Sequence, residues 1–268
     1  MVTQRNQEVS LRRRTGMIRR VRNPIGMIRR SQQVRSQLKA PRERLPGGSR
    51  RWIRTSMDWL VSEFGRDVLL RPIALPADVV QEPYDGSEAA AIELCQRIDA
   101  RMDLRPGQCG LSFELNGVRR PVNRLMVKEE SGRWIRGDGQ NRIQLAPALT
   151  GDPVALAAIY AHEVGHELLL GSGRITLWRR PDHEPLTDLL TVFYGLGIFT
   201  ANAAYERRPR PNGRGKQPLA RGYLREAALS EALAYYAMLR GERHPEWDRH
   251  LDPPVRRGMR NQLAILCR

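Results

Sequence analysis

YAHEVGHEL, at residues 160–168, holds the most informative pattern in the chain. Within it, His162 and His166 lie four residues apart, and on an α-helix this spacing places both imidazoles on one face. Two histidines so placed can bind one zinc ion, and Glu163 beside the first can act as general base toward a water molecule at the metal. The pattern HExxH therefore predicts a metal site on a helix, with two ordinary surface histidines as the alternative.

The residues around this pattern favour a helix. Asp152 is a good N-cap, and Pro153 suits the first helical position because the missing N–H of proline has no partner to lose there. Residues 154–170 contain no further proline and are rich in alanine and leucine, and Gly171 is a suitable residue to follow the helix. We expect Gly165 to remove side-chain bulk next to the metal.

A third candidate ligand follows the two histidines. Glu184 and Asp188 form ExxxD, again at the i,i+4 spacing of a helix. Together the two motifs resemble those of the gluzincin metallopeptidases, in which the HExxH helix is followed by a second helix bearing ExxxD. The resemblance covers about residues 141–206. It implies one Zn²⁺ per chain with Glu184 as the third ligand, and it implies that Asp188 orients one of the histidines.

The second motif departs from a regular helix at one position. Pro185 directly follows Glu184, which must therefore lie at the very start of its helix. For this reason Asp188 and His183 stay open as alternative third ligands, and we expect Asp182 to cap the second helix. The longer metzincin pattern HExxHxxGxxH is absent.

The cysteines argue against a framework of disulfide bonds and against a peptide deformylase. Cys95, Cys109 and Cys267 form no CxxC motif, and their odd number and wide spacing favour reduced thiols in a cytoplasmic protein. Peptide deformylases also carry HExxH, but they need a cysteine ligand followed directly by leucine and serine. Here Gly110 intervenes after Cys109, so that pattern is broken.

The positive charge of the chain is concentrated at its N-terminus. The formal net charge is +16, and residues 1–55 hold 16 Lys+Arg against two acids, which leaves 29 Lys+Arg and 27 Asp+Glu for the rest. We predict a basic, disordered tail at 1–51 and a zincin-like metallohydrolase domain at 52–268. Such a tail could bind nucleic acid or an anionic membrane, or it could serve as a targeting peptide. The alternative is that translation starts at or near Met57, in which case these residues are not part of the protein.

The resemblance implies a zincin-like α+β fold, in which a small, twisted, mostly antiparallel sheet lies beside the HExxH helix and further helices follow. In such a fold the edge strand of the sheet pairs with an extended substrate, and residues 142–147 are the candidate for that strand, with an ordinary half-buried strand as the alternative. Residues 207–222 are predicted to form a surface loop. A short helix or turn is expected at 56–64. Helices are expected at 87–102, 154–170, 186–205, 222–240 and 255–266, and strands at 67–72, 110–115, 134–135 and 141–146, with a hairpin turn at 116–117.

The function predicted from these features is that of a zinc-dependent metallopeptidase acting on a peptide or protein, with Glu163 as general base. The apolar stretch 189–204 is shorter than the roughly 20 residues of a membrane-spanning helix, so no transmembrane segment is expected. The alternative is a non-catalytic zincin-like binding protein with a structural zinc, whose tail docks nucleic acid or membrane. Peptide hydrolysis also needs a group that stabilises the oxyanion, and the candidates are Tyr223, Tyr235, Tyr236, His244 and His250.

Overall fold

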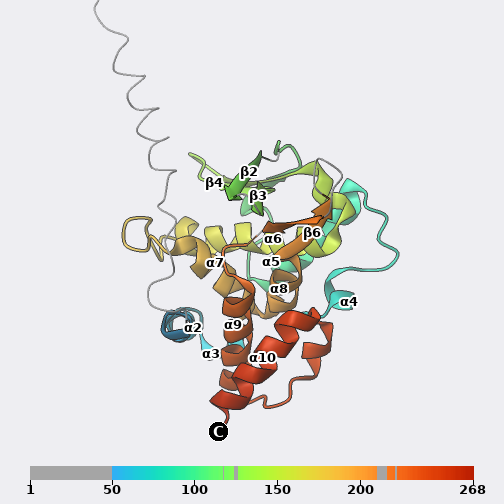
Figure 1. Cartoon of the computed structure of the whole chain (residues 1–268). Helices are drawn as coiled ribbons and strands as arrows, with labels where there is room; N and C mark the ends of the chain where they lie inside the picture. Colours follow the sequence, from blue (N-terminus) through green and yellow to red (C-terminus); the bar gives the residue numbers. More distant parts are fainter. Residues whose placement is uncertain (1–49, 117, 124–125, 210–215, 221) are drawn as a thin grey trace, which may run out of the picture. The chain divides into compact units, whose positions relative to one another are not determined.

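The fold is α+β and mostly helical (Figure 1). The computed structural model describes residues 50–116, 118–123, 126–209, 216–220 and 222–268. The predictions made for the basic tail at 1–49 therefore lie outside the described residues. Residues 50–51, which the sequence pattern assigned to the tail, belong to the first described helix, α2 (Arg50–Phe64).

Helix α6 (Pro153–His166), which carries HExxH, packs against both the sheet and the neighbouring helices. It begins as predicted: the Asp152 carboxylate accepts the N–H of Ala155, and Pro153 occupies the first turn. In Figure 1, α6 lies between the strands and the remaining helices. It contacts strands β4 and β5 on one side, and on the others it contacts α5 (Glu88–Arg101), α7 (His183–Thr191) and α8 (Gly197–Ala203).

Strand β5 (Asn141–Leu145) is the central strand of a small three-stranded sheet. It runs parallel to β1 (Cys109–Ser112) and antiparallel to β4 (Gly132–Ile135), in the order β1-β5-β4. The prediction of 142–147 as an edge strand is therefore wrong, and β4 is the outer strand that lies against α6. The sheet is mixed rather than mostly antiparallel because the long connection through β2–β4 brings β5 back alongside β1 in the same direction.

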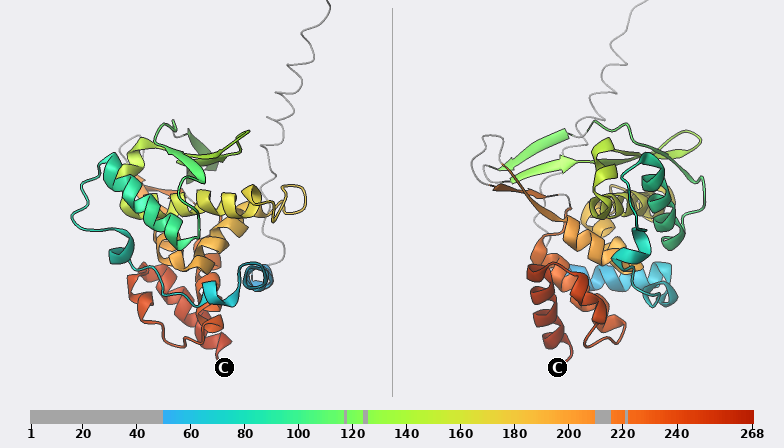
Figure 2. Two further views of the ribbon diagram at one scale, coloured as in Figure 1. Left: turned by 180° about the vertical axis from the view of Figure 1, so that it is seen from behind. Right: turned by 90° about the vertical axis from the view of Figure 1, so that its right-hand side faces the viewer.

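A second sheet has the order β2-β3-β7-β6 and is also mixed. Its first strand pairs with β3 and not with β1, so the hairpin predicted at 116–117 is wrong; residue 117 itself is outside the described residues. The surface loop predicted at 207–222 is wrong for residues 207–209 and 216–220, where β6 and β7 pair antiparallel and lie beside the other strands in the right-hand view of Figure 2; residues 210–215 and 221 are outside the described residues. The strands are β2 (Val118–Asn123), β3 (Met126–Glu130), β6 (Tyr205–Pro209) and β7 (Lys216–Ala220).

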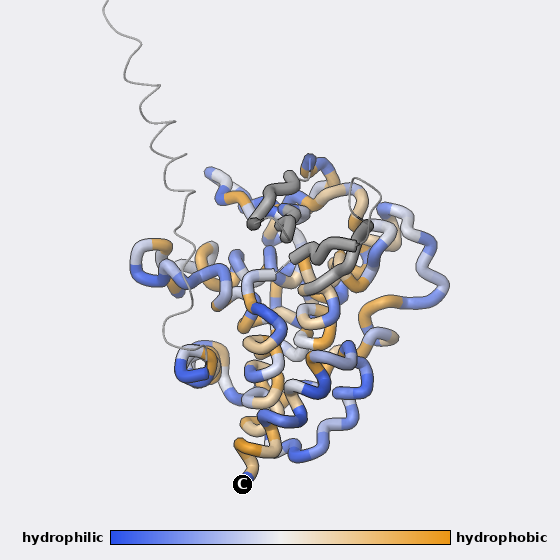
Figure 3. The backbone as a smooth tube through the Cα atoms, viewed as in Figure 1, coloured by the Kyte–Doolittle hydropathy of each residue, from blue (hydrophilic) through white to orange (hydrophobic). Residues whose placement is uncertain are grey.

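Three further helices agree with the sequence patterns. Helix α5 is capped as expected, since the Ser87 hydroxyl accepts the N–H of Ala90. Helices α9 (Glu226–Leu239) and α10 (Pro253–Leu266) follow the second sheet. In Figure 3, α2 and α10 carry both hydrophilic and hydrophobic residues, as expected for helices with one face on the core and the other on the surface.

Two helical regions differ from their predictions. Residues 67–72 do not form a strand; α3 (Arg66–Leu69) buries Val68 and Leu69 instead, and the short α4 (Pro76–Val79) follows. The helix predicted at 154–170 ends at Gly171 as expected, but its last turn, η2 (Glu167–Gly171), is π-helical.

The helix predicted at 186–205 begins earlier and is interrupted. It starts at His183 and runs through α7, the π-helical turn η3 (Val192–Leu196) and α8, with the interruption at Gly195, whose φ is 79°. The run from His183 to Ala203 has 21 residues and is, by length and composition, apolar enough to cross a membrane. However, 94% of its most apolar window is buried inside the protein, as in the core helix of a globular domain.

Candidate metal centre

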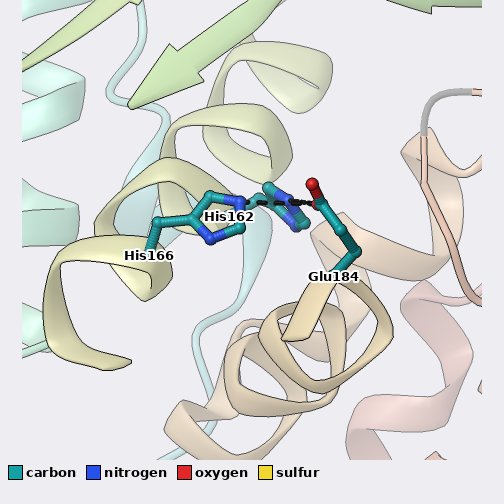
Figure 4. Close-up of side chains that lie close together, drawn as sticks. All are labelled: His162, His166 and Glu184. Atoms are coloured by element: carbon teal, nitrogen blue, oxygen red, sulfur yellow. Dashed lines mark hydrogen bonds and ion pairs between the residues drawn. The ribbon is translucent and has the colours of Figure 1, made fainter. Parts of the chain in front are cut away.

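Three side chains from two helices converge at one point. His162 and His166 come from α6, and Glu184 comes from the first turn of α7. One donor atom from each of these residues lies within 4.8 Å of the others. Figure 4 shows both imidazole rings directed toward the carboxylate of Glu184. The predicted pairing of HExxH with the glutamate of ExxxD is therefore present in the fold.

The distances between these donors fit a single metal ion. The carboxylate Oε2 of Glu184 lies 3.2 Å from Nε2 of His162 and 3.4 Å from Nε2 of His166. Two donors bound to one tetrahedral zinc at about 2.0–2.1 Å are themselves roughly 3.3–3.4 Å apart. Two imidazoles and one carboxylate are also a donor set that zinc accepts. The group can thus hold a metal ion, while its identity as zinc stays a prediction.

Asp188 lies behind His162 rather than among the donors. Its Oδ1 is 2.8 Å from Nδ1 of His162, and its Oδ2 accepts the backbone N–H groups of Tyr223 at 2.6 Å and Leu224 at 2.8 Å. An Nδ1–H donated to this carboxylate leaves the Nε2 lone pair directed toward the shared point. The position of Asp188 therefore suits a residue that orients a ligand, and Glu184 is the carboxylate that faces the histidines.

Glu163 lies beside this group and is held by the neighbouring sheet. Its side chain is buried, with 6% exposed, and Oε2 accepts the backbone N–H of Trp134 in β4 at 2.6 Å. Strand β4 passes close to α6, because a Cβ on Gly132 would lie 2.5 Å from Ile159 and 2.8 Å from Glu163. Sequence reasoning missed the contribution of Trp134, since no local pattern shows which strand a helix will face.

The charges of the centre favour a cation. Burial alone would lower the pKa of His162, but hydrogen bonds to Asp188 and Glu184 outweigh it and raise the pKa to about 10. Burial would likewise raise the pKa of Glu184, yet its bonds to His162 and His166 hold that pKa well below the usual value. Burial raises the pKa of Glu163. Three carboxylates thus surround two imidazoles, an arrangement that stabilises a positive charge between them.

Only one of the three tyrosines proposed for the oxyanion contacts the centre. The ring of Tyr223 stacks on His162 with centroids 5.5 Å apart and planes at 13°, and a hydrogen bond links its side chain to Glu184. Tyr235 instead donates to Asp58, and Tyr236 donates to the carbonyl of Leu69.

The two histidines considered with those tyrosines lie elsewhere. His244 lines a cavity of about 450 Å³ together with Ile73 and Trp247. The ring of His250 accepts a hydrogen bond from Arg249, and its carbonyl accepts one from Asn202.

The alternative ligands occupy other environments. The ring of His183 lies 5.7 Å from that of His166, yet His183 is not part of the group of convergent donors. The thiol of Cys109 interacts with Glu167 and is not part of the group of convergent donors, so it does not take the place of a deformylase ligand. The three cysteines are unpaired; the cytoplasmic location inferred from them stays a prediction.

Two expectations about local roles are corrected. Asp182 occupies the N-cap position of α7, but its carboxylate does not cap the helix; it accepts from Trp52 and Arg180. Gly165 is needed for the packing of α6 on α7, because a Cβ there would lie 2.6 Å from the methyl group of Thr187.

Comparison of the chain with protein-family models, curated proteins and solved structures finds no match. The gluzincin resemblance therefore rests on the two motifs and on the geometry that they form.

Proposed function

We propose that this chain is a zinc-dependent metallopeptidase that hydrolyses peptide bonds. The observation that carries the proposal is the meeting of His162, His166 and Glu184 at one point, with the carboxylate of Glu163 beside them. Within the described residues, no fourth protein donor joins this group. Three protein ligands are typical of catalytic zinc sites, which keep a position for water or substrate, whereas structural sites normally have four.

When bound to these residues, zinc would supply a Lewis acid that makes water more acidic and polarises a carbonyl group. Glu163 is the proposed general base. Its carboxylate is held in place by the N–H of Trp134, and its raised pKa favours proton uptake closer to neutral pH. It accepts a proton from the attacking water and delivers it to the departing nitrogen. Water thereby adds to the carbonyl carbon, the C–N bond breaks, and a carboxylic acid and an amine are formed.

Tyr223 is the proposed donor to the oxyanion. A phenol O–H can donate a hydrogen bond to the negative oxygen that develops during hydrolysis, and the O–H of Tyr223 would turn from Glu184 to do so. Burial raises the pKa of Tyr223, so the hydroxyl keeps its proton at neutral pH. As a whole residue Tyr223 is 40% exposed, and its ring lies against His162, a position that suits contact with both the metal ligands and an incoming substrate.

Strand β4 is the proposed binding surface for an extended peptide. It is one of the two outer strands of its sheet, the one beside α6, and the main chain of a peptide can add to such an edge as a further strand. The backbone N–H of Trp134 in this strand is bonded to Glu163. A peptide aligned along β4 would therefore pass beside the proposed general base.

The proposal is tested by measuring zinc and proteolysis together. Purified wild type, Glu163→Gln and Glu184→Ala are analysed for bound zinc and incubated with a panel of unfolded proteins. We expect about one zinc in the wild type and in Glu163→Gln, and little in Glu184→Ala. Only the wild type should cleave at a measurable rate. Cleavage by Glu163→Gln at the wild-type rate would refute the role of Glu163. Bound zinc without any hydrolysis would favour the alternative of a structural site.

A further inference from the structure

Glu167, which directly follows His166, is a buried carboxylate that the proposed reaction does not use. Only 5% of the residue is exposed. Its Oε2 accepts from the indole Nε1 of Trp134 at 2.8 Å and from the side-chain amide of Asn141 at 2.7 Å, and its Oε1 accepts from the side chain of Gln108 at 3.0 Å. In the described part of the chain, no lysine or arginine forms an ion pair with it. Burying a carboxylate without a positive partner is costly unless its oxygens accept enough hydrogen bonds, and both oxygens of Glu167 do so.

Trp134 is bound at two points by two carboxylates of the same helix face. Its indole N–H donates to Glu167, and its backbone N–H donates to Glu163. Glu163 and Glu167 are four residues apart, one turn along the helix. Glu167 therefore holds the indole end of Trp134, and Glu163 is held by the backbone end of the same residue.

The surroundings of Trp134 restrict it further. Asn141 begins β5 and also accepts the N–H of Gly137, which ties together the turn between β4 and β5. Arg136 lies over the indole ring, 5.4 Å from its centroid, and donates to the carbonyl of Leu170. Gly171 leaves room for the carboxylate of Glu167, which a Cβ at that position would displace.

We propose that Glu167 is a positioning residue: it holds the indole of Trp134, so that the backbone N–H of Trp134 fixes the carboxylate of Glu163 next to the metal-binding group. The inference rests on the proposed function, because it assigns a purpose to the fixed orientation of Glu163. Preorganised catalytic groups need such support, since a misplaced base slows the reaction without changing the binding of substrate.

The test compares variants that keep or remove the acceptor. Glu167→Gln retains an oxygen for the indole, and the amide of Gln108 can turn to match the new NH₂ group. Glu167→Leu places an apolar side chain without an acceptor at this position, while Trp134→Phe removes the indole donor and keeps an aromatic, though smaller, ring beside Arg136. Glu231→Gln is the matched control, because Glu231 is equally buried, with 2% exposed, but pairs with Arg54 of α2 instead.

The first readout is independent of catalysis. The full chain is labelled with ¹⁵N-tryptophan, and hydrogen exchange is followed at the indole and backbone N–H of Trp134. In Glu167→Leu we expect both groups to exchange at least tenfold faster than in the wild type, with Glu167→Gln and Glu231→Gln near the wild type. In Trp134→Phe there is no tryptophan label at position 134, so this variant is tested by the kinetic readout alone.

The second readout is kinetic, on a substrate that the wild type cleaves. Glu167→Leu and Trp134→Phe should each lower kcat at least tenfold with KM within about twofold and metal content unchanged. The double variant should lose no more than the worse single one, since both break one interaction. Glu167→Gln should restore most of kcat.

Unchanged exchange at Trp134 in Glu167→Leu would overturn the inference, as would a kcat in Trp134→Phe equal to that of the wild type. If Glu167→Leu does not fold, the comparison of Trp134→Phe with Glu231→Gln decides the kinetic part. If the wild type binds zinc but cleaves nothing, the proposed function fails. The exchange data on Glu167→Leu, or on Glu167→Ala if the leucine variant is insoluble, then still show whether Glu167 holds Trp134.

Discussion

Replacing Asp188 with alanine removes the carboxylate that lies behind His162. The variant loses the bond to Nδ1 of His162 and leaves the backbone N–H groups of Tyr223 and Leu224 without their acceptor. Loss of such a partner of a metal ligand typically lowers metal affinity about 10–100-fold, which corresponds to about 1.4–2.7 kcal/mol. A buried donor left unpaired costs about 1–3 kcal/mol; because the N–H of Leu224 is buried and that of Tyr223 only partly so, the free energy of unfolding should also fall by at least about 1–3 kcal/mol.

The two effects are separated by measuring each of them. Zinc affinity is obtained by competition with a chelator of known Kd, and stability by urea denaturation of the metal-free protein. Asp248→Ala serves as the control, because Asp248 is also buried but bonds to Arg260 of α10. It should lose stability and keep the zinc affinity of the wild type. If Asp188→Ala folds and binds zinc as tightly as the wild type, then Asp188 does not orient a ligand and the reasoning is wrong.

Three further substitutions are predicted from the same geometry. Glu163→Gln should keep its metal and lose about 10²–10⁴-fold in turnover, because general acid–base catalysis contributes about that much; an unchanged kcat in a peptidase assay would contradict this. Asp99→Asn should alter the pH dependence of stability. Burial raises the pKa of Asp99 to about 6, against the bond from Tyr160 that lowers it, so the folded state binds the proton more tightly than the unfolded state. Asp99 therefore destabilises the wild type as pH rises from about 4 to 6. Urea denaturation should show the Asp99→Asn variant gaining stability relative to the wild type over that range. A difference in unfolding free energy between the two proteins that stays constant with pH would contradict this. Gly165→Ala should cost about 1–3 kcal/mol by overpacking against Thr187, and a higher denaturation midpoint would show that α7 moves aside easily.

Short-range patterns were sufficient to predict several parts of the site. Residues four apart on a helix share a face whatever surrounds the helix, so HExxH and ExxxD each present their side chains together. The beginning of α6 at Asp152 and Pro153 also follows from local hydrogen bonding and backbone geometry. The meeting of the two helices was different, since only the resemblance to gluzincins indicated that Glu184 faces the histidines.

The sequence by itself thus determined most of the longer helices and the side chains that each one presents, because helical hydrogen bonds and caps connect neighbours in the chain. Only the tertiary structure decided that β4 is the outer strand beside α6 and β5 the central one, that Tyr223 lies on His162, and that Glu167 and Glu163 share Trp134. Strand pairing and packing join residues that are far apart in sequence. Their free energy depends on the shape and the hydrogen bonding of the assembled core, and no local pattern of residues records it.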